Sequence, residues 1–225
     1  MKHQREMTLD HARSMASALV ELLKPACEHV AVAGGVRRGR ARPQHVEIVA
    51  LPRFLGTGES SWRNLFDERC DELLKSGVLV KRADSQGRYA WGQKLKRAVF
   101  YQGANRAPVD LFAVIPPAQW GVIYALRTGP GRFNRLLVTG QRRGGACPLD
   151  RKVAGGRVWF IDPGRADLAR MTAPRFARQA EVGQIEASLV ATPTEEDFFR
   201  QLSVPYWPPE DRTVARLIAY LRQKS

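Results

Sequence analysis

Apolar side chains recur at helical spacing near the start of the chain. Between residues 9 and 23, leucines and alanines return every three or four positions, which is the period of an amphipathic helix. Thr8 is a good N-cap, and Pro25 prevents the helix from continuing. We therefore expect a helix over residues 8–24 that packs on the rest of the chain.

Short apolar runs follow, separated by residues that favour turns. The segments HVAVAGG and VEIVAL predict two strands, the first of which ends in a glycine turn. Three further runs, rich in β-branched and aromatic residues, follow one another later in the chain: VLVKR, LKRAVFYQ and APVDLFAVI. Consecutive strands favour a mixed sheet with antiparallel partners over a strictly alternating β-α-β array.

Helical patterns lie before and after this group of three strands. The pattern before it can be capped by Ser61 and ends at Gly77. Pro117 opens the pattern after it, which stops at the RTGPG turn before FNRLLV resumes a helical spacing. We expect these helices to cover the sheet.

The last third of the chain has a different composition. Glycine and arginine are dense over residues 140–160, which predicts a short hairpin. A helix capped by Thr194 and an amphipathic helix over residues 212–223 follow. We expect an α/β (α+β) fold in which a mixed β-sheet flanked by helices spans residues 1–140 and a smaller α+β subdomain spans residues 141–225.

Basic residues outnumber acidic ones in this chain. The 225 residues include 36 Lys and Arg against 22 Asp and Glu, a formal charge of +14, which favours contact with polyphosphate. Nucleic acid is the first partner to consider, and a merely solvated cationic surface is the alternative. The three cysteines lack the spacing of zinc sites or disulfide frameworks, so we expect buried or incidental thiols. Neither a membrane span nor a signal peptide is apparent, which predicts a cytoplasmic protein without membrane contact.

The first strand ends in a segment that suits a phosphate. Gly34 and Gly35 form a turn whose backbone can approach a phosphate closely. Arg37 and Arg38 follow with donors for phosphate oxygens. An ordinary turn with solvated arginines is the alternative interpretation.

His45, Glu47 and Asp110 are candidates for a cation site. His45 and Glu47 are two positions apart on a strand and therefore project from the same face. Asp110 lies in an apolar run, where a carboxylate is costly unless it is paired, hydrogen-bonded or bound to a cation. The alternatives are a satisfied edge histidine for His45 and a buried ion pair with an arginine for either acid.

Three segments in order resemble the DNA polymerase X family of DNA polymerase beta-like nucleotidyltransferases. GGVRRGRARPQHVEIV is similar to the family motif in which GS, an arginine pair and a strand with two acids occur in order. Residues 108–134 resemble the third-acid strand, its following helix and the TG turn with FN. TEEDFFRQLSVPYWPPEDR resembles the C-terminal signature of the family. Short bacteriophage and prophage members match the pattern best.

The resemblance implies a palm over residues 1–140, a thumb-like subdomain over residues 141–225, and a role for each matching residue. The residues implied at the triphosphate are Gly34, Gly35 and Arg38. The implied ligands of divalent metal are Glu47, Asp110 and, as a candidate third, His45. The residues implied beside the incoming sugar and base are Thr128, Gly129, Phe133 and Asn134.

The implied activity is the addition of nucleotides from a nucleoside triphosphate to a DNA 3′ hydroxyl, with release of pyrophosphate. Two divalent ions, Mg²⁺ or Mn²⁺, would clamp the attacking and leaving oxygens. Arg142 and Arg143, in their glycine-rich setting, would contact the DNA backbone, and a solvated face is the equal alternative. The sequence gives no signal for an oligomer, so we expect a monomer.

The chain departs from the family pattern at the centre of the mechanism. His45 stands where the family has an aspartate that can bridge two metals, and neutral imidazole offers one lone pair to one metal. Gly35 replaces a serine, so only backbone can contact phosphate there, and Leu126 and Arg127 replace an aromatic pair. Slow, Mn²⁺-restricted catalysis is one expectation.

A catalytically impaired DNA- or nucleotide-binding module that retains the polymerase fold is the rival hypothesis. A carboxylate such as Glu59 or Asp84 near His45 would favour an enzyme, whereas an arginine paired with Asp110 would favour the module. A third hypothesis is a nucleotidyltransferase that modifies RNA or a protein. Zinc-dependent deamination is disfavoured because the HxE sequence lacks a PCxxC partner.

Overall fold

The computed structural model describes residues 7–56 and 62–224. The chain divides into two units, Met1–Ile115 and Pro116–Ser225, and each is described by itself. The sequence places the boundary at residue 140 instead. The observed boundary falls earlier because the helices over residues 120–138 share a hydrophobic core with the C-terminal helices.

The first unit opens with the predicted amphipathic helix. Helix α1 spans Leu9–Leu23, and the Thr8 side chain accepts a hydrogen bond from the backbone N–H of His11. This hydrogen bond satisfies one of the free N–H groups at the start of the helix. The expected N-cap and the expected extent of this helix are therefore confirmed.

A five-stranded mixed sheet forms the centre of the first unit. Its order is β1-β2-β7-β6-β5, and only β2 and β7 pair in parallel. The strands are β1 (Cys27–Ala33), β2 (Val46–Pro52), β5 (Leu79–Lys81), β6 (Leu95–Gln102) and β7 (Asn105–Ala113). The predicted mixed sheet with antiparallel partners is confirmed.

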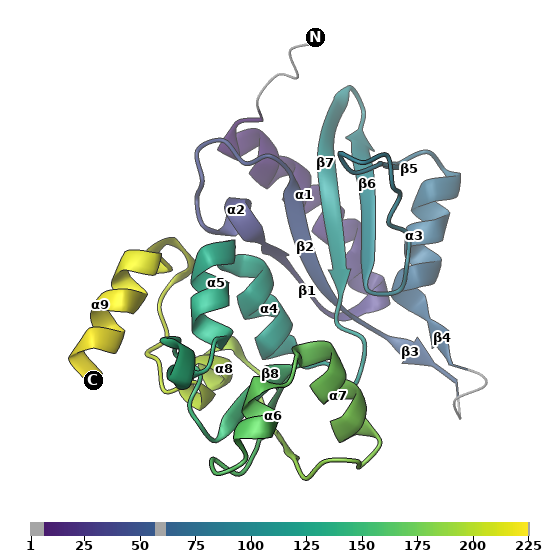
Figure 1. Cartoon of the computed structure of the whole chain (residues 1–225). Coiled ribbons are helices and arrows are strands. Elements are labelled where there is room, and N and C mark those ends of the chain that lie inside the picture. Colours follow the sequence, from purple (N-terminus) through teal and green to yellow (C-terminus); the bar gives the residue numbers. More distant parts are fainter. Residues whose placement is uncertain (1–6, 57–61, 225) are drawn as a thin grey trace. The chain divides into compact units, whose positions relative to one another are not determined.

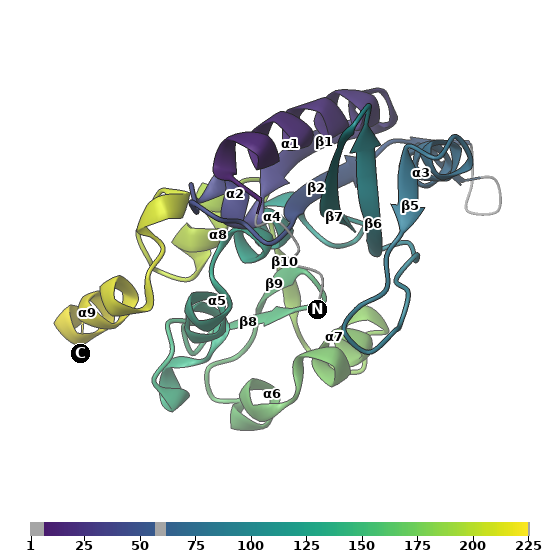
Figure 2. The same ribbon diagram turned by 90° about the horizontal axis from the view of Figure 1, so that it is seen from above.

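Helix α3 joins α1 against one face of the sheet. It spans Leu65–Lys75, and its N-cap is Asn64, whose side chain accepts a hydrogen bond from the backbone N–H of Asp67. The predicted cap, Ser61, lies outside the described residues. Figures 1 and 2 show both helices on the same side of the sheet, where they bury its apolar face.

A helical turn and a two-stranded ribbon were not expected from the sequence. The Gly34–Arg37 segment forms a single helical turn, α2, where only a glycine turn is predicted. Strands β3 (Phe54–Leu55) and β4 (Arg63–Asn64) pair in a small antiparallel ribbon. Both elements lie at strand ends, where apolar periodicity gives no signal.

The second unit contains a three-stranded sheet and several helices. Its sheet has the order β10-β9-β8. Its strands are β8 (Arg151–Ala154), β9 (Arg157–Phe160) and β10 (Ser188–Val190). Its α-helices are α4 (Trp120–Thr128), α5 (Gly131–Val138), α6 (Ala166–Arg170), α7 (Ala173–Glu181), α8 (Glu195–Gln201) and α9 (Val214–Lys224). Single turns of 3₁₀ helix span Lys24–Ala26 in the first unit and Gln141–Arg143 and Pro209–Asp211 in this one.

Several predictions for the second unit can be checked against these elements. The expected hairpin is β8–β9, and Thr194 caps α8 through a reciprocal capping box with Asp197. Pro117, however, does not open a helix, because α4 begins at Trp120. Helices α6 and α7 were not predicted. None of the described helices is long and apolar enough to cross a membrane.

The three cysteines are buried free thiols, as expected. Burial raises the pKa of Cys27 to about 12 and that of Cys147 to about 11. Burial also raises the pKa of Cys70. Protonated, buried thiols are poor nucleophiles and poor metal ligands.

A buried ion pair stabilises the C-terminal part of the second unit. Arg212 is 1% exposed, and its Nη1 donates to Glu195 Oε1 over 2.8 Å. Its Nε donates to the backbone carbonyl of Trp207 over 3.0 Å. Because both charged groups are buried, removing one leaves the other without a compensating charge.

We expect Arg212→Ala to lower the free energy of unfolding by about 3–5 kcal/mol, the usual result of breaking a buried pair. Urea unfolding followed by tryptophan fluorescence measures the change. The exposed Arg222→Ala should change the free energy by less than about 0.5 kcal/mol. A loss below about 1 kcal/mol in Arg212→Ala would show that the pair contributes little to stability.

Candidate functional site

The two predicted acidic metal ligands lie side by side in the sheet. Glu47 on β2 and Asp110 on β7 are register partners in the parallel strand pair. Their sequence neighbours Ile48 and Leu111 are fully buried in the core beneath α1 and α3. Successive side chains of a strand point to opposite faces, so Glu47 and Asp110 project from the face opposite those helices.

His45 completes this group from the residue just before β2. Its Nε2 lies 3.7 Å from Glu47 Oε1 and 3.8 Å from Asp110 Oδ2. The three residues are partly or wholly buried, with side-chain exposures of 32% for His45, 21% for Glu47 and 9% for Asp110. The structure therefore brings together three residues that are separated by up to 65 positions in the sequence.

Two arginines that the sequence did not single out, Arg82 and Arg97, lie against Asp110. Arg82 Nη2 donates to Asp110 Oδ1 over 2.6 Å. Arg97 is the register partner of Asp110 on β6, and its Nε lies 3.6 Å from Asp110 Oδ2. A buried carboxylate needs such compensation. The alternative of a buried arginine pair, left open by the sequence, is the one observed for Asp110.

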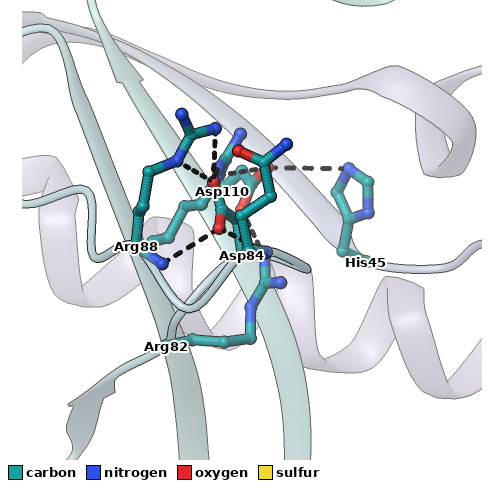
Figure 3. A network of polar contacts seen from close by, with 7 residues as sticks. His45, Arg82, Asp84, Arg88 and Asp110 are labelled. Atoms are coloured by element: carbon teal, nitrogen blue, oxygen red, sulfur yellow. Dashed lines mark hydrogen bonds and ion pairs between the residues drawn. The ribbon is translucent and has the colours of Figure 1, made fainter.

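The charge network continues beyond Asp110 to Asp84. Arg97 Nη1 lies 3.7 Å from Asp84 Oδ2, and Arg88 Nη2 donates to the same oxygen over 3.0 Å. Backbone N–H groups of Arg88 and Gln86 also donate to Asp84 and lower its pKa. Figure 3 shows this network, in which Arg82 and His45 approach Asp110 from different directions. Asp84 thus joins the network through Arg88 and Arg97, and the other candidate carboxylate, Glu59, lies outside the described residues.

The conformation of Gly34 is fitted to the Glu47 side chain. Gly34 has a φ of +59°, and a Cβ atom at this position would lie 1.4 Å from Glu47 Oε2. The backbone N–H of Gly35 donates to Glu47 Oε2 over 3.3 Å. Glycine is therefore required beside this carboxylate. The same contact engages the Gly35 N–H that the sequence assigns to a phosphate.

As arranged, these residues do not form a metal cage. Among the residues that the structure describes, no group of three or more His, Cys, Asp or Glu side chains is placed to hold a metal ion. Asp110 Oδ1 already accepts a hydrogen bond from Arg82. The donor set of two carboxylates and one imidazole nevertheless suits a divalent ion that accepts oxygen and nitrogen. An ion bound at Asp110 Oδ1 would have to displace Arg82.

The residues implied beside the sugar and base all lie in the second unit. Thr128 is fully buried and ends α4, and Gly129 follows it. Asn134 Nδ2 donates to the carbonyls of Leu126 and Gly129, over 2.6 and 2.9 Å. A Cβ atom on Gly129 would lie 2.1 Å from Asn134 Oδ1. These contacts fix the turn between α4 and α5.

Phe133 and Asn134 differ in what they can offer a nucleotide. Phe133 is fully buried, and its ring packs near the rings of Phe199 and Trp207. It is a core residue here and has no exposed surface for a sugar, contrary to the role implied by the resemblance. Asn134 Oδ1 is buried and has no hydrogen-bond partner within the described part of the chain, so this oxygen can still accept a hydrogen bond.

The residues implied at the triphosphate and DNA backbone are placed as follows. Arg38 is half-buried and follows α2 directly, in the same unit as Glu47. Arg142 and Arg143 are exposed in the 3₁₀ turn of the second unit, and Arg142 Nη2 donates to the carbonyl of Pro163 over 2.8 Å.

No protein-family model matches the chain, and no curated protein matches it.

The surroundings of His45 favour its protonated form. The adjacent Glu47 carboxylate raises the pKa of His45 above its ordinary value, while partial burial opposes this shift. Asp110 adds to the increase, and Arg82 opposes it. Because the pKa of His45 is higher in the folded than in the unfolded protein, protonation of His45 stabilises the fold. This stabilisation is complete below the unfolded pKa of about 6.5 and is lost as the pH rises through the folded pKa.

We expect the His45 imidazole of metal-free protein to titrate above about 6.5 and to titrate lower in Glu47→Gln. NMR titration of the histidine ring signals in EDTA measures both midpoints, and His45→Asn assigns the signal. A midpoint that is at or below the ordinary value, or that does not change in Glu47→Gln, would contradict the electrostatic role of Glu47.

Proposed function

We propose that this chain is a nucleotidyltransferase that adds nucleotides from a nucleoside triphosphate to a DNA 3′ hydroxyl and releases pyrophosphate. The supporting observation is the convergence of His45, Glu47 and Asp110 from two parallel strands. These are the positions that the polymerase X resemblance assigns to the metal site. The excess of basic residues is consistent with a nucleic-acid acceptor.

In the proposed reaction, each site residue of the first unit would have a distinct role. Glu47 and Asp110 would hold Mg²⁺ or Mn²⁺, with His45 as a third donor. A divalent ion, when bound, would neutralise charge on the reacting phosphate oxygens. Asp110 would lie nearest the attacking hydroxyl, and Arg38 would neutralise the triphosphate. One imidazole in place of a carboxylate lowers the negative charge of the site and favours Mn²⁺ over Mg²⁺.

Arg82 is the residue that must move for this chemistry. Its side chain is 30% exposed, whereas that of Asp110 is 9% exposed. The guanidinium can therefore turn towards solvent while Asp110 keeps its place on the strand. Arg97 remains on the neighbouring strand as a partial counter-charge, which weakens attraction for a second divalent ion.

We expect extension of a primer on recessed or one-nucleotide-gapped DNA, either directed by the template or by end addition, and faster in Mn²⁺ than in Mg²⁺. Asp110→Ala should reduce the rate on the order of a thousandfold, the scale of losing a transition-state charge stabiliser. His45→Asp should increase the rate in Mg²⁺ because it restores a carboxylate. Gel-based primer extension with each nucleotide measures these rates.

Glu21→Gln on the exposed surface of α1 is the matched control for loss of an acid. Its extension rate should equal that of the unmodified chain. Extension that survives Asp110→Ala would exclude this site as its source.

A DNA- or nucleotide-binding module without catalysis is the second candidate. The observation that favours it is the 2.6 Å pair between Arg82 and Asp110, which supplies a cation from the protein itself. In this case DNA binds through basic side chains, with strong salt dependence and no requirement for metal. The module would show no extension in either metal.

Arg82→Ala distinguishes these two candidates. In a nucleotidyltransferase, this change removes the group that competes with the metal for Asp110. Mn²⁺ should therefore bind to Arg82→Ala at least about tenfold more tightly than to the unmodified chain. Electron paramagnetic resonance of free Mn²⁺ measures the affinity. In a binding module, neither the chain nor Arg82→Ala should bind Mn²⁺ appreciably, and DNA affinity in EDTA should stay high. Arg88→Ala, which removes an arginine of the same network that does not contact Asp110, is the control.

A further inference from the structure

The second unit has a basic pocket of its own. A cavity of about 270 Å³ is lined by residues of the 3₁₀ turn, β8 and α6. Its basic lining residues are Arg142, Arg143, Arg151, Lys152 and Arg170. The other lining residues are small or apolar, and none of the lining residues is acidic. The pocket therefore combines concentrated positive charge with an apolar wall.

Three of the five basic groups are held in place by other contacts. Arg151 Nη1 donates to Asp150 Oδ2 over 2.6 Å, and Arg142 Nη2 donates to the Pro163 carbonyl. Lys152 Nζ donates to the carbonyls of Ala169 and Met171, over 2.9 and 2.7 Å. These donors are used within the protein, and they fix the wall of the pocket.

Arg143 and Arg170 have a different status. Across residues 7–56 and 62–224, neither guanidinium has a hydrogen-bond or ion-pair partner. Each guanidinium carries donors in a fixed fork that matches phosphate oxygens. Two unpaired forks at one pocket can receive an anion without first breaking an ion pair.

Like charges lie close together in this pocket. Partial burial lowers the pKa of Lys152, and the positive charge of Arg143 lowers it further. Mutual repulsion of this kind is a cost that an anion between the two groups would remove. The pocket therefore has more positive charge than the protein neutralises.

We propose that this pocket binds a phosphomonoester, the group that ends a free nucleotide or the 5′ end of a nucleic-acid strand. A phosphomonoester carries about 1.5 to 2 negative charges near neutral pH, against one for an internal phosphodiester. Arg143 and Arg170 bind its oxygens, and the apolar wall contacts the attached sugar or base. The site is a hollow of limited volume, which admits a chain end more readily than a continuing backbone.

This inference goes beyond nucleotide transfer by the first unit and does not depend on it. It also gives Arg143 a more specific role than contact with the DNA backbone. Arg142 is assigned a supporting role because its guanidinium already bonds to Pro163.

The test compares two single-stranded oligonucleotides, labelled at the 3′ end, with either a 5′ phosphate or a 5′ hydroxyl. Fluorescence anisotropy with the full chain at fixed salt should show roughly tenfold tighter binding of the phosphorylated strand, the scale of one charge-assisted contact. The double variant Arg143→Ala/Arg170→Ala should bind both strands equally. Both side chains are exposed, so the substitutions should leave the fold intact, which circular dichroism checks.

Arg175→Ala/Arg178→Ala is the matched control. It removes the same charge from exposed positions of α7 in the same unit, outside this pocket, and should keep the preference for phosphate. Asp110→Ala should also keep it, so a failure of the nucleotidyltransferase proposal would not affect this result.

Competition identifies the source of the phosphate. Displacement of the phosphorylated strand by a deoxynucleoside 5′-monophosphate or by inorganic phosphate, but not by the deoxynucleoside, supports a site for a free phosphomonoester. A preference for the phosphorylated strand without such displacement supports a strand end. Equal affinity of the unmodified chain for the two strands would overturn the proposal, as would an equal loss of preference in the control pair.

Discussion

The candidate site depends on one constraint, which is that two carboxylates occupy neighbouring positions of a sheet whose other face is buried. Glu47 and Asp110 are register partners only because β2 and β7 pair in parallel. Side by side, two anions repel each other and lose hydration, so the fold must supply positive charge. It does so from the same row of the sheet, where Arg97 is the antiparallel partner of Asp110, and from Arg82 beyond the end of β5. His45 supplies a third source, whose pKa is raised by the same acids.

The need for positive charge links the two candidate functions physically. A carboxylate that is 9% exposed is costly unless it is protonated or its charge is neutralised, and either a guanidinium or a divalent ion can neutralise it. Under the proposed function, a metal ion would compete with Arg82 for Asp110 Oδ1, and the balance between them would decide whether the site is catalytic. His45 stands where the polymerase X pattern has an aspartate, and it would move this balance towards the arginine because the imidazole adds no negative charge to attract a metal. The departure from the polymerase X pattern at His45 would thus change the metal affinity of the whole site.

The sequence predicted several elements whose signal is local, and it missed the contacts of the site that depend on strand register. The helix after Thr8 and the mixed sheet follow from apolar periodicity and β-branched runs, and Asp110 was singled out because it interrupts such a run. Arg97 could not be singled out in this way, because its pairing with Asp110 depends on how β6 and β7 align. Phe133 was assigned to a nucleotide by resemblance, whereas the burial that makes it a core residue is a property of the packed helices. The neighbouring Asn134 combines a structural contact with a free acceptor. Its amide nitrogen holds the turn between α4 and α5, and its oxygen has no hydrogen-bond partner among the described residues.

The excess of positive charge alone says little about binding, because the placement of acids decides what each arginine does. Arg212 is fully buried and forms an ion pair with Glu195, so its charge stabilises the fold and is not accessible to a ligand. Arg143 and Arg170 line a pocket without a lining acid, so their charge is available only to something from outside. A cluster of like charges raises the free energy of the fold through repulsion. A protein that needed only solubility could spread the same arginines over its surface, where water and salt screen them. Their concentration around one cavity, next to an apolar wall, is therefore better explained by an anionic ligand than by a requirement of folding.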